Sequence, residues 1–151
     1  MHVELSTEIN ATPQAVWDLT IDFRRISELA PDTAEEVTYV SEGAVGVGSV
    51  FRERVRIGPM RSETEWRVTE FDPPRRHVHV GATGPLKEVV ATEIEPTDQG
   101  TLLRHVVDVQ ATGLLRPVGW LLDALVLRRK MVSTLQATQS SVKKIVEAER
   151  S

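Results

Sequence analysis

The sequence predicts an α+β fold in which a long C-terminal helix lies across a curved antiparallel sheet. A stripe of residues spaced by three and four runs through residues 117–150, where no Gly or Pro follows Gly119: Leu121, Leu125, Arg128, Val132, Leu135, Gln139, Val142 and Val146. This spacing describes one face of a helix about 45 Å long at ~1.5 Å per residue. Short strand-like segments precede the helix, so we expect it to pack over the sheet that they form.

The remaining elements follow in the order strand, two short helices and six strands. Alternating apolar residues in 3–9 predict a first strand with one buried face. Thr12 as N-cap and Pro13 as first helical residue begin a two-turn helix, while Asp22 caps a second helix that Pro31 ends. Turn residues then separate six segments with strand character: 36–42, 49–57, 61–71, 76–81, 87–95 and 101–111. Together these segments predict a seven-stranded antiparallel sheet.

Length and composition narrow the functional classes. A chain of 151 residues is expected to form one domain, residues 1–151, that buries ~70% of its unfolded surface. The absence of cysteine excludes disulfides, thiol nucleophiles and sulfur-ligated zinc, and it fits a cytoplasmic protein. The net charge of −4 argues against a nucleic-acid partner. The first ten residues lack the pattern of a signal peptide, and the longest apolar segment, 120–127, is too short to span a membrane.

Several segments carry a resemblance to a known superfamily: "TPQAVWDLTIDF", "GVGSVFRERVRIG", "WRVTEFDPPRR", "DQGTLLRHVVDV" and the closing helix. With the element order, they resemble the START-like, helix-grip superfamily (SRPBCC), and within it the bacterial polyketide cyclase/dehydrase and lipid-transport group. The resemblance covers residues 3–147. It implies a START-like ligand-binding domain whose sheet wraps the C-terminal helix and leaves a cavity for a lipid, quinone, hormone or polyketide. Because fold does not fix function, it implies no particular reaction and no catalytic residue.

Two ionisable residues are predicted to point at the long helix. Glu53 shares a strand face with Phe51 and Val55, opposite three arginines that should face solvent. A carboxyl group among apolar neighbours needs a partner or a raised pKa, unless it reaches water or a salt bridge near the strand end. His105 lies between Leu103 and Val107 on the last strand. It is either a hydrogen-bonded packing residue, a polar contact for a ligand, or an acid/base group.

Two further histidines, His77 and His79, share one face of a strand about 7 Å apart at ~3.3 Å per residue. Val78 and Val80 lie on the opposite face of this strand and could equally be the inward set. The pattern therefore does not decide which face the two histidines occupy. Inward histidines beside Glu53 would make a metal site geometrically conceivable, but His-x-His alone is a weak signal and we expect no metal. The glycines in residues 43–48 precede a strand where a dinucleotide site needs a helix, so we expect no cofactor.

A basic run, Arg128, Arg129 and Lys130, follows the apolar segment 120–127. The simplest interpretation is a solvated helix surface. Alternatively, the apolar residues make transient contact with an anionic membrane or form a homodimer interface. Arg128 alone could instead turn inward to pair with Glu53 or with a ligand carboxylate.

Three functional hypotheses remain. The first is a binder or carrier of a small hydrophobic molecule, because few polar groups interrupt the expected apolar cavity. The second is a cyclase/dehydrase-type enzyme in which His105 and Glu53 transfer protons. The third is a protein-interaction module with a vestigial cavity. The residues expected to contact a ligand are Phe51, Glu53, Val55, Thr64, Trp66, His77, His79, Thr92, Leu103, His105, Val107, Arg128, Val132, Leu135 and Gln139.

Overall fold

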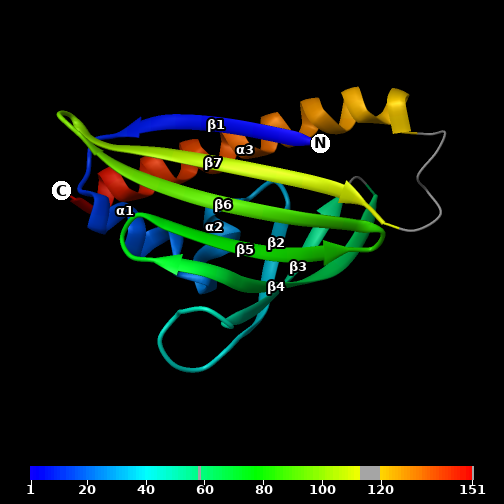
Figure 1. Ribbon diagram of the computed structural model, residues 1–151, viewed down its shortest axis with the longest axis horizontal. Helices are drawn as coiled ribbons and strands as arrows, with labels where there is room; N and C mark the ends of the chain where they lie inside the picture. The colour runs from blue at the N-terminus through cyan, green and yellow to red at the C-terminus, as the bar shows by residue number, and fades with distance from the viewer. Residues whose placement is uncertain (58, 113–119, 151) are drawn as a thin grey trace.

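The seven-stranded sheet and the long C-terminal helix are both present, which confirms the predicted α+β helix-grip fold (Figure 1). The computed structural model describes residues 1–57, 59–112 and 120–150, with all their side chains except those of residues 57, 60, 120–124 and 150. The antiparallel strand order is β1-β7-β6-β5-β4-β3-β2. The strands are β1 His2–Ile9, β2 Ala34–Val40, β3 Val50–Ile57, β4 Met60–Asp72, β5 Arg76–Thr83, β6 Leu86–Thr97 and β7 Gly100–Ala111, and the helices are α1 Pro13–Thr20, α2 Ile26–Leu29 and α3 Trp120–Arg150.

The strand boundaries differ from prediction mainly at β2. This strand begins at Ala34 and ends at Val40, two residues earlier than expected at each end. Strands β4 to β7 extend by one or two residues past most predicted ends, because cross-strand pairing continues into residues that look like turns. The prediction for the two short helices holds in outline, since Thr12 Oγ1 accepts a hydrogen bond from the Ala15 amide at 3.2 Å. Asp22, in contrast, makes no side-chain capping bond, and the 3-10 turn Phe23–Arg25 precedes α2.

The N-terminal part of α3 corrects the predicted inward stripe. Leu125 is 65% exposed, and Arg128 is exposed with its Nη1 donating to the carbonyl of His2 at 2.8 Å. His2 is the first residue of β1, so the part of α3 before Arg128 extends past the end of that edge strand. The expected helix start at residue 117 and the side chain of Leu121 lie outside what the structure describes. No helix in the described part of the chain is long and apolar enough to cross a membrane.

The core lies between the inner face of the sheet and the helices. Its largest cluster joins α1 to the C-terminal end of α3, with Trp17, Leu103 and Val142 among its buried members. In a second cluster, nearer the N-terminus of α3, Leu135 packs with Val107. A third cluster contains Phe51 of β3 and Trp66 of β4. Between these clusters the sheet and α3 are not fully packed together, and the candidate site occupies that space.

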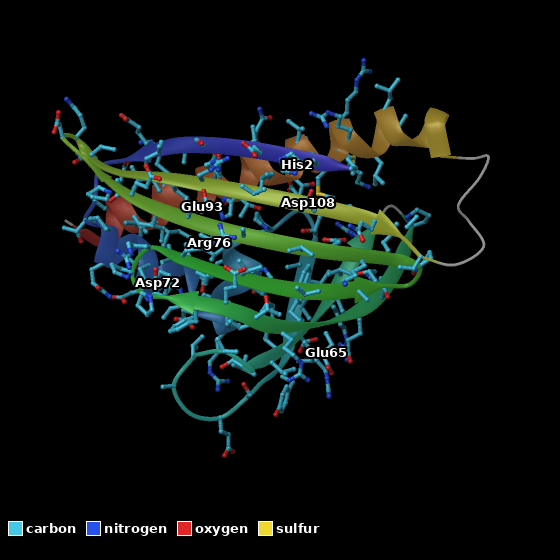
Figure 2. All side chains as sticks on the ribbon, in the orientation of Figure 1. His2, Glu65, Asp72, Arg76, Glu93 and Asp108 are labelled. Atoms are coloured by element: carbon cyan, nitrogen blue, oxygen red, sulfur yellow. The ribbon has the colours of Figure 1, made fainter. Side chains whose placement is uncertain are left out.

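The outer face of the sheet carries a network of ion pairs, and Arg76 and Glu93 lie side by side on it (Figure 2). Arg104 bridges Glu4 and Glu93, and Arg76 bridges Glu93 and Glu70, so a charge chain crosses five strands. The three glutamates and two arginines range from partly to largely exposed, and such pairs contribute little individually. These charged residues keep much of the outer face solvated, although Val78 of β5 is buried on it.

Candidate functional site

Two adjoining cavities lie between the sheet and α3, each of about 170 Å³. The first, which we call the histidine cavity, contains His77, His79 and His105 in its wall and reaches α2. The second, the threonine cavity, lies toward the N-terminal half of α3 and contains Thr64 and Thr83. The two cavities adjoin and together form the candidate site, because their walls have five residues in common: Glu53, Trp66, Glu88, Met131 and Thr134.

Strand register explains why residues far apart in sequence meet here. His77 on β5 pairs with Thr92 on β6, and Thr92 pairs with His105 on β7. Directly paired residues of antiparallel strands point to the same face, so these three side chains form one row under α3. A second row runs from Trp66 through Gly81 to Glu88. The two rows bring five polar side chains to the site: His77, Thr92, His105, Trp66 and Glu88.

Most residues expected to contact a ligand line these cavities. They are Glu53, Val55, Thr64, Trp66, His77, His79, Thr92, His105, Val107 and Leu135. The open question about β5 is also answered, because His77 and His79 are 1% and 9% exposed and both face the cavity.

Five expected residues line neither cavity. Phe51 is wedged between Phe23 and Trp66, with ring centroids 4.3 and 6.2 Å away. Leu103 is fully buried in the cluster beneath α1, and Val132 packs into the second core cluster. Their predicted face was correct, but packing against neighbours leaves them behind the cavity wall. Arg128 contacts the backbone of β1 instead of a ligand or Glu53, as described above.

Gln139, the fifth of these residues, positions His105. Its amide nitrogen donates to the Leu5 carbonyl at 2.8 Å and lies 3.2 Å from Nδ1 of His105. Because a carbonyl can only accept, the nitrogen of the amide must face both groups, and Nδ1 of His105 accepts the second bond. The ring proton of His105 therefore lies on Nε2, and burial lowers the pKa of this histidine to about 4. His105 is a neutral hydrogen-bond donor at neutral pH.

Glu53 is the acidic centre of the site. It is 6% exposed, and its Oε1 accepts the Trp66 indole N–H at 2.7 Å. Burial raises the pKa of Glu53 to about 7, the Trp66 bond opposes this rise, and the charge of Glu88 adds to it. Oε2 is buried and has no hydrogen-bond partner among the described residues. Glu53 therefore does not reach water or a salt bridge, and it exchanges a proton near neutral pH.

His77 and His79 present a second set of polar atoms. Thr20 donates its hydroxyl to the Trp17 carbonyl, so it accepts from Nε2 of His77 at 3.4 Å and leaves Nδ1 of that ring unprotonated. Burial, together with the neighbouring histidines, lowers the pKa of His77 to about 4 and of His79 to about 3. Nδ1 of each ring is buried without a partner in the described part of the structure. Both histidines are therefore neutral and can bind a ligand group through hydrogen bonds.

Sequence reasoning missed Glu88 and the residues that the short helical segments before β2 contribute to the site. Glu88 shares a strand face with Val90 and Thr92, so alternation along β6 could have identified it. Burial raises the pKa of Glu88 as well. Phe23 of the 3-10 turn and Ile26 of α2 also line the histidine cavity. No local pattern in the sequence shows that these two segments border it. Within the residues that the structure describes, no group of three or more His, Cys, Asp or Glu is arranged to hold a metal ion.

Comparison with known proteins decides the family. The family described as polyketide cyclase/dehydrase and lipid transport matches residues 1–147. The chain belongs to this family. A curated relative, an uncharacterized protein of Mycobacterium tuberculosis strain H37Rv, is 30% identical over 120 residues, which cover 78% of this chain and 82% of the relative.

Solved structures agree with the polyketide cyclase/dehydrase and lipid-transport family in fold. The Zhui aromatase/cyclase of Streptomyces sp. R1128 has a TM-score of 0.74 at 20% identity, over 100% of this chain and 96% of that one. A protein of unknown function from Staphylococcus aureus has a TM-score of 0.77 at 11% identity, over 99% and 95% of the two chains. At these identities the likeness establishes the helix-grip fold alone.

Proposed function

We propose that residues 1–151 act as one ligand-binding domain that holds a small, largely apolar molecule between the sheet and α3. One observation carries the proposal. Three buried side-chain atoms lack a hydrogen-bond partner within the described structure, Glu53 Oε2, His77 Nδ1 and His79 Nδ1, and all belong to residues that line the histidine cavity. Buried polar atoms are normally hydrogen-bonded, so their concentration here favours a ligand that supplies the missing groups.

The rest of the wall suits an apolar body. Phe23, Trp66 and Val90 line the histidine cavity beside Leu135 and Val142 of α3. Aromatic and aliphatic walls with a few converging polar groups are the usual composition of a small-molecule site. The family match supports the same class of ligand.

Native mass spectrometry of the purified protein tests this proposal, together with titration by Nile red, an uncharged apolar dye. Thr134 of α3 lines both cavities, so Thr134→Trp should fill the site and abolish binding. Ser133 is exposed on the same helix, and Ser133→Trp provides the matched control, which should bind as the wild type does. Equal dye binding by both variants, or no binding by the wild type, would refute the proposal.

A second candidate function, proton-transfer catalysis of the cyclase/dehydrase type, is favoured by the placement of Glu53 and His105 in one cavity wall. A carboxylate with a pKa near 7 suits general base catalysis at neutral pH. Glu53 would take a proton from a carbon next to a ketone, and that carbon would form a bond to a second carbonyl carbon of the same molecule. The second carbonyl oxygen, hydrogen-bonded by Nε2–H of His105, would receive the proton that Glu53 had taken, which restores the carboxylate of Glu53.

Turnover of a linear β-polyketone, followed by chromatography of the cyclised product, tests the catalytic candidate. His105→Gln should lower turnover by ~100-fold or more while Nile red still binds. If the wild-type protein binds the polyketone but forms no cyclised product, the catalytic candidate is refuted and the binding function stands.

A further inference from the structure

The site is acidic in a way that an apolar-ligand site does not require. Glu53 and Glu88 line both cavities, and the exposed Asp22 lies at the edge of the histidine cavity. The histidine cavity has no Lys or Arg among its described lining residues, and its three histidines are held neutral by burial. Lys130, which is exposed, lines only the threonine cavity. Any charge on the wall of the histidine cavity is therefore negative.

Neither carboxyl group in this wall has a cationic partner. Glu53 receives only the Trp66 indole N–H, and its Oε2 is buried without a bond within the described structure. Glu88 is half-buried and makes no hydrogen bond or ion pair with a described residue. On the outer face, by contrast, Glu65 pairs with Arg52 at 2.7 Å and Glu93 bridges two arginines. Buried carboxylates are ordinarily paired, so Glu53 and Glu88 lack the positive partner that their burial calls for.

The surrounding rings favour the same kind of ligand. Phe23 and Trp66 line the histidine cavity, and the ring of His79 lies 5.0 Å from that of Trp66 and perpendicular to it. Aromatic faces attract cations as well as apolar rings. An ammonium group attached to an apolar body would meet carboxylates and aromatic rings together, whereas a carboxylic acid would add a negative charge beside Glu53 and Glu88.

We propose that this site selects ligands that carry a protonated amine on an apolar, aromatic body, with the ammonium group beside Glu53 and Glu88. The inference rests on the proposed binding function and specifies its ligand class. It separates this site from one built for fatty acids, in which a cationic side chain would face the head group.

Three compounds with one ring system and different head groups test the inference: 2-(1-naphthyl)ethylamine, 2-(1-naphthyl)ethanol and 1-naphthylacetic acid. Isothermal titration calorimetry at pH 8 should rank the amine first and the acid last. Glu53→Gln should weaken the amine by ~30-fold or more, as expected for loss of one partner of a buried charge pair. The same substitution should change the affinity for the alcohol by less than ~3-fold.

Two further variants complete the design. Glu88→Gln tests the second carboxyl group independently and should also weaken the affinity for the amine. Because Glu88 makes no bond that the fold depends on, this variant keeps the test valid if Glu53→Gln unfolds. Glu65→Gln, on the outer face (Figure 2), is the matched control and should leave all three affinities unchanged. An acid that binds as tightly as the amine, or an amine affinity that survives both inner substitutions, overturns the inference. If the inference is overturned but the wild type binds Nile red, the binding function stands and only its ligand class is wrong. If the wild type does not bind Nile red either, the proposed function itself is wrong.

Discussion

Replacing Glu53 by Gln should remove a pH dependence of stability that the buried carboxyl group imposes on the fold. The pKa of about 7 in the folded protein exceeds the usual value of 4.5, so the folded state retains the proton more strongly than the unfolded state. Glu53 therefore destabilises the fold progressively as pH rises from 4.5 through 7. At about 1.4 kcal/mol for each pH unit between the two pKa values, the full effect is about 3 kcal/mol, of which roughly 2.5 kcal/mol falls between pH 5 and pH 8.

Urea unfolding at pH 5 and pH 8, followed by tryptophan fluorescence, measures this effect. Between pH 5 and pH 8 the free energy of unfolding of the wild type should fall by roughly 2.5 kcal/mol more than that of Glu53→Gln. The buried histidines act in the opposite direction, because their lowered pKa values stabilise the fold as pH rises to 6.5, but they do so equally in both proteins. Glu65→Gln, which removes an exposed carboxylate, should follow the wild type. Identical pH dependence in wild type and Glu53→Gln would show that Glu53 is not held protonated by burial.

Two other predictions concern residues that support the site. A Cβ at Gly81 would lie 2.5 Å from the ring of Trp66, so Gly81→Ala should displace that ring, lower Tm and shift its fluorescence, whereas Gly46→Ala, with open space around it, should not. Gln139→Leu leaves the partly buried Leu5 carbonyl and the buried Nδ1 of His105 without their donor, so it should lower the free energy of unfolding in urea by about 1–3 kcal/mol. Gln136→Leu, on the exposed face of α3, should lower it much less. Unchanged stability in Gly81→Ala or Gln139→Leu would contradict these contacts.

Local periodicity was sufficient to predict the elements and several of the site residues. The alternation of Glu53 against three arginines predicted its inward face, because one side of β3 is solvated and the other is not. The same argument correctly placed Trp66 and His105. It left His77 and His79 undecided because Val78 between them is buried as well, so β5 has no solvated face there to identify the other. Alternation predicts orientation only where the two faces of a strand differ in exposure.

The sequence by itself determined the order of the elements, the long helix and most inward faces, since these depend on spacing within one segment. Only the tertiary structure decided which inward residues line a cavity and which, like Phe51, are covered by neighbours. It also decided the protonation of His105, because Gln139 is 34 residues away along the chain and reaches the ring only when α3 lies over β7. Arg128 shows the same dependence, because its hydrogen bond to the His2 carbonyl forms only when α3 lies beside β1. Contacts between distant segments depend on register and on how the helix is seated, and neither is encoded in a local pattern.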